Sequence, residues 1–192
     1  MTMMRKPLKQ KGVAVIELPL IALVLMVVMS GLVVVHKLLH LQSRLDRTAF
    51  SMVDASAVAL VPPHTRMLYD QNSASDLLRM AQRVLADTLP KEKLGLVLEM
   101  RLAAEGSPVE VMSQRAGHDC DVRQPIESLG ALAPISASPI ASLKGRTADL
   151  FQVTLCVSAP FETDIPLVNW LLLALPLKMS SQAVMIGRNY HA

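Results

Sequence analysis

The sequence predicts an α+β protein in which a long N-terminal transmembrane helix is followed by a small globular head with an antiparallel sheet. Three observations favour it: an apolar run near the start, a heptad-like pattern continuing from that run, and short alternating segments further on. We expect four parts. They are a cytoplasmic leader at 1–12, the transmembrane part of the helix at 13–35, its extramembrane continuation at 36–61, and a periplasmic head at 62–192.

The composition excludes several classes of function. The 192 residues carry a formal net charge of +3 and are 52% hydrophobic, with a mean hydropathy of +0.38, which argues against a plain soluble enzyme and against a disordered chain. Aromatic residues make up 3% of the chain, too few for stacking platforms, so we expect no nucleic-acid partner. No Gly-rich phosphate loop or Gly-x-Ser-x-Gly motif occurs. We therefore predict a protein that is not an enzyme and has no cofactor or metal.

Charge and apolar residues are concentrated at the front of the chain. Residues 1–12 carry four cations and no acid, and 19 of the 23 residues at 13–35 are apolar, with Glu17 as the one charge. A helix of this length spans about 35 Å, enough for a hydrocarbon core of about 30 Å. The cationic leader keeps the N-terminus cytoplasmic and places the head across the membrane. We expect a protein that crosses the membrane once.

The helix is predicted to continue beyond the span. Apolar residues recur at heptad-like spacing after Lys37, and no Gly or Pro interrupts the chain between Leu32 and Val61. Pro62-Pro63 then ends the run. A helix from Val13 to about Leu60 would be roughly 70 Å long. Pro19 lies in its first turns, where it predicts a kink or local loosening.

The head is predicted to contain one more helix and four strands. The helix covers about 76–89, with Ser73 or Ser75 as its cap and Pro90 closing it. Its apolar face would consist of Leu77, Met80, Ala81, Val84 and Leu85. The strands are predicted at 96–102, 109–112, 150–158 and 182–186, with a turn near Gly106-Ser107-Pro108 between the first two and a long ordered loop at 116–148.

A second apolar stretch, Ile165–Leu177, contains Trp170. It is too short to cross a membrane, so we expect core packing, with a docking surface as the alternative.

Cys120 and Cys156 are the two cysteines of the chain. Because the head is expected outside the cytoplasm, a disulfide is the favoured interpretation, and two buried free thiols are the alternative. A bridge would use the cysteine of His118-Asp119-Cys120-Asp121, which otherwise resembles a zinc or nucleophile site. His36 and His40 share a helix face but lack a third ligand, so we interpret them as polar residues at the membrane border.

Glu17 is the most informative single residue. A charge within a span is costly and marks a functional site by default, although an acid near the edge could also simply extend to the headgroups. The segment Lys11-Gly12-Val13-Ala14-Val15-Ile16-Glu17 resembles the cleavage signature of type IV prepilins. This resemblance implies cleavage after Gly12 by a prepilin peptidase. The new amine of Val13 would then pair with Glu17 of a neighbouring subunit.

Several segments resemble the TadF-type minor pseudopilins of tight-adherence (Tad/Flp) pili. They are Leu45-Asp46-Arg47, Phe50-Ser51-Met52-Val53, Thr65-Arg66-Met67-Leu68-Tyr69, Val153-Thr154-Leu155-Cys156 and Ser180-Ser181 with Val184 and Gly187-Arg188. The chain departs from that family at Leu18, where Phe or Tyr is frequent, and at Pro62-Pro63, which replaces a more helical stretch.

The resemblance implies a small single-pass protein of the bacterial inner membrane. It would be a structural subunit that acts in assembly, initiation or tip structure of an adhesive pilus. Its partners would be the membrane, the peptidase, other pilin or pseudopilin subunits and the inner-membrane assembly platform. Two alternatives remain: a minor pseudopilin of type II secretion or another type IV pilus, and a single-pass anchored periplasmic sensor or binding domain.

Overall fold

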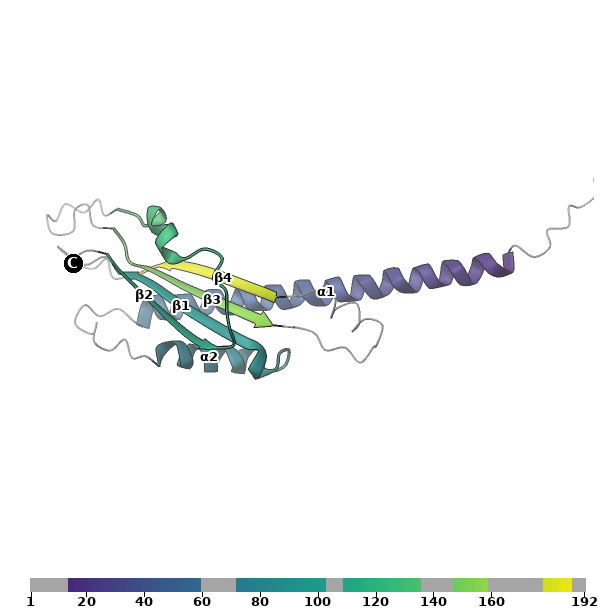
Figure 1. Ribbon diagram of the computed structural model, residues 1–192, viewed down its shortest axis with the longest axis horizontal. Coiled ribbons are helices and arrows are strands. Elements are labelled where there is room, and N and C mark those ends of the chain that lie inside the picture. The colour runs from purple at the N-terminus through teal and green to yellow at the C-terminus, as the bar shows by residue number, and fades with distance from the viewer. Residues whose placement is uncertain (1–13, 60–71, 103–108, 136–146, 159–177, 188–192) are drawn as a thin grey trace, which may run out of the picture. The chain divides into compact units, whose positions relative to one another are not determined.

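The computed structural model describes residues 14–59, 72–102, 109–135, 147–158 and 178–187 (Figure 1). Its contacts divide the chain into two compact units, Met1–His40 and Leu41–Ala192. The predicted α+β class is confirmed, with a long N-terminal apolar helix followed by a small four-stranded antiparallel sheet.

Helix α1 runs from Ala14 to Ala59, close to the predicted bounds. It continues unbroken through Pro19, which lies near its start. Pro19 is the sixth residue of the described helix, just beyond the first-turn N–H groups that have no intrahelical partner in any case, so the helix continues with one backbone hydrogen bond missing. The described helix ends before Pro62-Pro63, which lies outside the described residues.

The sheet has the order β2-β1-β3-β4, and every neighbouring pair is antiparallel (Figure 1). The strands are β1 (Leu94–Leu102), β2 (Glu110–Gly117), β3 (Leu150–Ser158) and β4 (Lys178–Ile186). The prediction for β3 is correct to the residue, and the other three strands are longer than predicted. The turn predicted between β1 and β2 lies outside the described residues.

The inner face of the sheet carries the main core. Alternate residues of β1 and β3, such as Leu96 with Leu155 and Leu98 with Val153, are paired in register and fully buried. They belong to one cluster with the buried residues of α1 and α2. The α1 members are Leu41, Leu45, Ala49, Met52, Val53 and Ala57. The second half of α1 thus completes the fold of the head.

Helix α2 (Ser73–Val84) differs from the prediction in its bounds, its cap and part of its buried face. It begins at Ser73 and ends at Val84, and its N-cap is Asn72, whose carbonyl accepts the Asp76 N–H at 2.9 Å. Ser75 donates its hydroxyl to that same carbonyl instead of capping the helix. Of the predicted face, Ala81 and Leu85 are buried and Leu77 packs partly buried against the core, as expected. Met80 and Val84 are exposed, and Ala74 and Leu78 are buried in their place. The buried stripe is therefore rotated from the predicted one.

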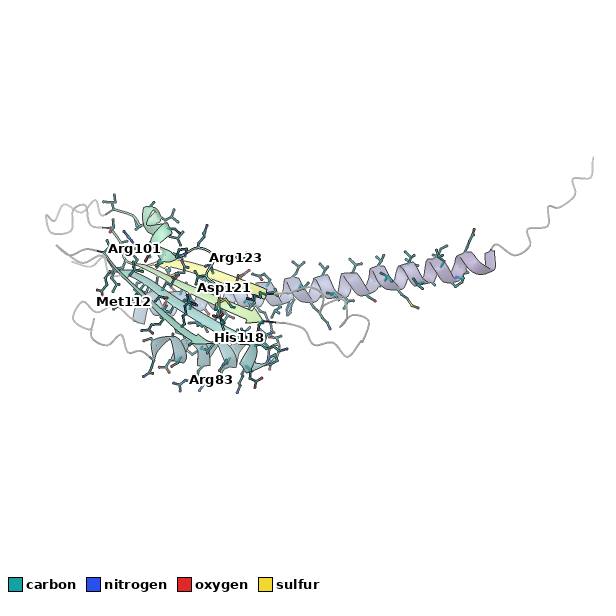
Figure 2. The ribbon with its side chains drawn as sticks, in the orientation of Figure 1. Arg83, Arg101, Met112, His118, Asp121 and Arg123 are labelled. Carbon is teal, nitrogen blue, oxygen red and sulfur yellow. A yellow bond between two sulfur atoms is a disulfide. The ribbon has the colours of Figure 1, made fainter. Side chains whose placement is uncertain are left out.

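The outer face of the sheet is crossed by the segment that follows β2. This segment contains the 3₁₀ helix η3 (Ile126–Leu132), and Ile126 packs with Ala133 and Leu150 of the sheet. Asp121 and Arg123 lie on its first part (Figure 2). The predicted loop at 116–148 therefore contains the end of β2, η3 and a bridge between Ile135 and Thr147. The apolar stretch with Trp170 lies outside the described residues, as do Gly12 and Val13.

Candidate functional site

The first candidate site is the acid in the apolar half of α1. Between Ala14 and Val35, Glu17 is the one charged residue, and its side chain is exposed, with exposed Leu18, Leu20 and Ile21 following it. No described residue bonds to its carboxylate. This helix is the one candidate membrane span among the described residues. Over 18 residues its mean hydropathy is 2.9, and none of these residues is buried. Helices that are apolar on every side and unburied suit a lipid environment.

Cys120 and Cys156 form a disulfide in the structure, with Cα atoms 5.4 Å apart. Both are buried and pack with Val97, on the outer face of β1. The bond joins the segment that crosses the outer face after β2, residues 118–135, to the central strand β3. We call residues 118–135 the covering segment. The pair therefore has a structural position, and neither cysteine is a free thiol.

Gly95 permits the close approach of the covering segment to β1. A Cβ added at this position would clash with the His118 carbonyl oxygen, which is backbone and cannot rotate away. His118 also donates its backbone N–H to the Leu94 carbonyl at 3.1 Å. The disulfide is thus set beside a point where two backbones are nearly in contact.

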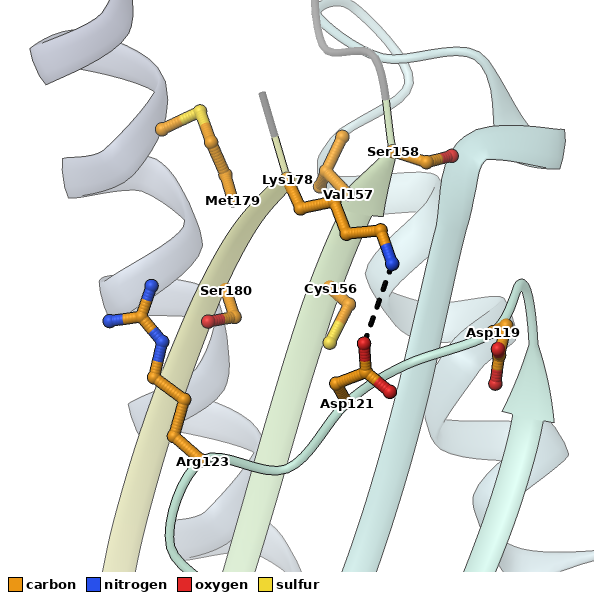
Figure 3. A pocket seen from close by; sticks show the side chains of 9 residues that line it. All are labelled: Asp119, Asp121, Arg123, Cys156, Val157, Ser158, Lys178, Met179 and Ser180. Carbon is orange, nitrogen blue, oxygen red and sulfur yellow. Dashed lines mark hydrogen bonds and ion pairs between the residues drawn. The ribbon is translucent and has the colours of Figure 1, made fainter. Parts of the chain in front are cut away.

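A hollow of about 190 Å³ lies beside the disulfide (Figure 3). Its lining residues are Asp119, Asp121, Arg123, Cys156, Val157, Ser158, Lys178, Met179 and Ser180. The Lys178 ammonium lies 3.4 Å from the Asp121 carboxylate, and both side chains are well exposed. No group of three potential metal ligands occurs among the described residues. The hollow therefore offers an open surface of mixed charge.

Glu99 is a buried carboxylate on the outer face of the sheet, 8% exposed. It accepts hydrogen bonds from Gln152 Nε2, at 2.9 Å, and from the Ile126 backbone. Gln152 Nε2 also donates to the Gln124 carbonyl at 2.8 Å. Burial is the largest influence and raises the pKa of Glu99 above its ordinary value of 4.5, while the Ile126 bond and the Arg115 charge act in the opposite direction.

The alternation of β1 predicted Glu99 on the polar side of the strand. It did not reveal that η3 covers this side, because the covering residues are 27 positions further along the chain. The signal available in the sequence was the pair of cysteines, since a bridge from Cys120 to β3 must bring the intervening segment across the sheet.

Asp46 joins the second half of α1 to the edge strand β4. Its Oδ1 accepts the Ser181 hydroxyl at 2.6 Å and Gln42 Nε2 at 3.0 Å. Gln42 Nε2 also lies 3.5 Å from the Ser180 carbonyl. Three polar side chains therefore fix this helix against β4.

The family model described as "Putative tight adherence pilin protein F" (TadF) matches residues 6–188. The chain belongs to the TadF family. No match was found among curated proteins or among solved structures.

The TadF match covers every described helix and strand. It includes Glu17, both cysteines, and both partners of the Asp46–Ser181 hydrogen bond. The family assignment supports a Tad pilus-related protein and is consistent with a structural, non-enzymatic subunit.

Proposed function

We propose that this TadF-family chain is a minor pseudopilin that a prepilin peptidase cuts after Gly12, and that it acts in assembly or initiation of a Tad-type adhesive pilus. The observation that carries the proposal is Glu17, an exposed carboxyl in an apolar helix with no bonding partner among the described residues. Its position, five residues beyond Gly12, is the one that the prepilin signature requires.

The chemistry follows from the charge that cleavage would create. Hydrolysis of the Gly12–Val13 peptide bond leaves a protonated amine on Val13 at the edge of the membrane. Glu17 of one subunit then pairs with the amine of its neighbour, and each charge compensates the other in a medium of low dielectric constant. Removing one member of such a desolvated pair costs about 3–5 kcal/mol, which is more than a hundredfold in an equilibrium constant.

Two features of the chain support a periplasmic head. The four leader cations favour a cytoplasmic N-terminus, and a disulfide forms and persists in oxidising compartments such as the periplasm. Loss of the leader removes all four cations and takes the formal charge from +3 to −1. The basic character of the chain thus belongs to a segment that serves topology and processing, and the partners would be the membrane, the peptidase, other pilin subunits and the inner-membrane assembly platform.

The processing step is tested by the N-terminal mass of the membrane-bound protein in cells with and without the prepilin peptidase. The mature form should begin at Val13 in cells that contain the enzyme and at the original N-terminus in cells that lack it. An intact leader in both strains would overturn the proposal and favour an anchored sensor or binding domain. Matured protein with normal Tad piliation in a deletion strain would favour a pseudopilin of another secretion or pilus system.

The assembly step is tested with Glu17→Gln and Glu17→Val. Both should be cut normally but should abolish piliation, because neither carries the charge that pairs with the amine. Ser30→Ala is the matched control, since Ser30 lies in the same span and its hydroxyl bonds only the Met26 carbonyl one turn earlier. Normal piliation with Glu17→Gln would exclude the ion pair, and loss of piliation with Ser30→Ala would show that the effect is not specific to the charge of Glu17.

A further inference from the structure

A cationic patch follows the apolar part of α1. It consists of His36, Lys37 and His40, and all three side chains are exposed. Between Leu18 and Leu45 the sequence contains no acid, so no carboxylate of this stretch neutralises the patch. The positive charge of the patch comes from Lys37 and, when they are protonated, from the two imidazoles. We refer to these three residues as the His-Lys patch.

The depth of the His-Lys patch follows from helix geometry. The apolar run Leu18–Val35 has its centre between residues 26 and 27. Half of a hydrocarbon core of about 30 Å corresponds to about ten residues at 1.5 Å per residue. The border therefore falls at His36 and Lys37, and His40 lies about 5 Å further out. That is the layer of lipid headgroups, which is about 5–7 Å thick on each side.

The three side chains also share one side of the helix. At about 100° per residue, His36 and His40 are separated by about 40°, and Lys37 lies about 60° from His40. The opposite side carries Val35 and Leu39, which are exposed and apolar. The helix is therefore amphipathic around residues 35–40, with its three hydrogen-bond donors on one side.

We propose that the His-Lys patch binds the phosphate of anionic phospholipid headgroups, and that protonation of His36 and His40 strengthens this binding. Ammonium and imidazolium groups donate charge-assisted hydrogen bonds to phosphate oxygens. Cations near a bilayer surface attract anionic lipids. Histidine is the side chain whose charge ordinarily changes between about pH 5 and 8, so the affinity would increase on mild acidification. The proposal is independent of leader cleavage and of pilus assembly.

The surroundings of the patch favour lipid over a metal ion. Two imidazoles one turn apart supply two ligands, and no third ligand group occurs near them among the described residues. The nearest charged groups further along the helix are Arg44 and Asp46, and the Asp46 carboxylate already accepts the hydroxyl of Ser181. On the other side, the apolar run separates the patch from Glu17 and the leader.

The test uses the full-length protein in bilayers of phosphatidylcholine with a minority of phosphatidylglycerol. Spin-labelled lipids report the preference of the protein for the anionic species at pH 7.5 and at pH 5.5. We expect this preference to increase about fivefold or more on acidification, and we expect Lys37→Gln to lower it at both pH values. The leader Lys and Arg side chains keep their charge across this range, but an N-terminal α-amine gains protons within it, so the histidine variants are needed to assign the change with pH.

His36→Gln/His40→Gln should abolish the increase on acidification and leave the preference at pH 7.5 nearly unchanged. His118→Gln is the matched control, because this exposed histidine lies in the head, and it should retain the full increase. An increase that persists in the double variant would overturn the proposal, as would one that disappears in the control. Replacing chloride by inorganic phosphate at equal ionic strength should have no effect, and a lost preference would assign the patch to soluble phosphate.

Discussion

The Ser181 hydroxyl donates a 2.6 Å hydrogen bond to Oδ1 of Asp46, from a strand to a helix 135 residues away in the sequence. The two residues belong to separate segments of the chain, both of which resemble TadF sequences. Asp46 is exposed on α1, between the buried residues Leu45 and Thr48, so its side chain lies outside the core and can contact the edge strand. The bond gives a physical reason for an acid and a hydroxyl at these two positions.

Asp46→Ala should destabilise the head by about 1–3 kcal/mol. The substitution leaves the Ser181 hydroxyl, which is 4% exposed, without its acceptor, and a buried unsatisfied polar group has a cost of this size. The free energy of unfolding of the full chain, from denaturant titration in detergent, measures the effect.

Ser181→Ala is the informative counterpart of that substitution. It removes the donor and leaves an exposed carboxylate that water and Gln42 can still satisfy, so its cost should be smaller, about 1 kcal/mol or less. The double variant should be at least as stable as Asp46→Ala, because it also removes the buried hydroxyl that Asp46→Ala leaves unsatisfied. Additive effects of the two substitutions would contradict the hydrogen bond, because coupled partners are not additive.

Glu99→Gln should make the stability of the head less sensitive to pH. Burial raises the pKa of Glu99 in the folded state above 4.5, so ionisation is less favourable in the folded protein than in the unfolded chain. The contribution of this group is fully present below pH 4.5 and is lost as the pH rises through the folded pKa. The amide keeps an oxygen for the Ile126 N–H but carries no charge.

The measurement is the free energy of unfolding of both proteins at a series of pH values upward from 4.5. The variant should gain stability relative to the natural protein as the pH increases. A constant difference across the series would show that Glu99 titrates alike in both states. Glu110→Gln is the control, because Glu110 is exposed at the start of β2 and is not among the charges that shift the pKa of Glu99.

Local patterns in the sequence predict the sheet better than the helix surfaces. Residues 150–158 show the alternation of a strand and are flanked by Asp149 and by Ala159-Pro160, so both ends of β3 could be placed. In α2, Met80 and Val84 compete with Ala74 and Leu78 for the buried face. Hydrophobicity favours the larger pair, whereas the sheet accepts the side with two alanines, where Gln114 Oε1 receives the Ala74 N–H. The buried face of α2 is the one whose small side chains let the helix approach the sheet closely. No local pattern in the sequence of α2 shows this, because it depends on the sheet.

The same contrast between local patterns and long-range contacts applies to the functional residues. Glu17 and the cysteine pair could be identified from spacing and compartment, because their chemistry is unusual for their positions. The buried state of Glu99 and the partner of Asp46 could not, since each depends on a contact between segments far apart in the chain. Such contacts need the complete topology.

Gly95→Ala should destabilise the head by about 2–4 kcal/mol, at or above the usual range for overpacking. Its methyl group would collide with the backbone carbonyl of His118, so the covering segment must shift away from β1. Gly31→Ala is the matched control, because nothing lies within 4 Å of a Cβ at that position and alanine favours a helix. Denaturant unfolding of the head measures both. Equal stability of the two variants would show that the covering segment can retreat without loss.

Reduction of the Cys120–Cys156 disulfide should lower the free energy of unfolding by about 3–4 kcal/mol. The two cysteines are 36 positions apart, and closing a loop of this length restricts the unfolded chain by that amount in the chain-entropy description. Denaturant titrations with and without a reductant give the difference. Cys120→Ser/Cys156→Ser should match the reduced protein and should not respond to the reductant, which separates loss of the bond from other effects of the reagent.

Because the bond holds the covering segment over Glu99, the reduced protein should also lose the pH dependence that Glu99→Gln removes. If the bond acts on the unfolded chain alone, that pH dependence will survive reduction, and the covering segment must then be held by Ile126 and its apolar neighbours.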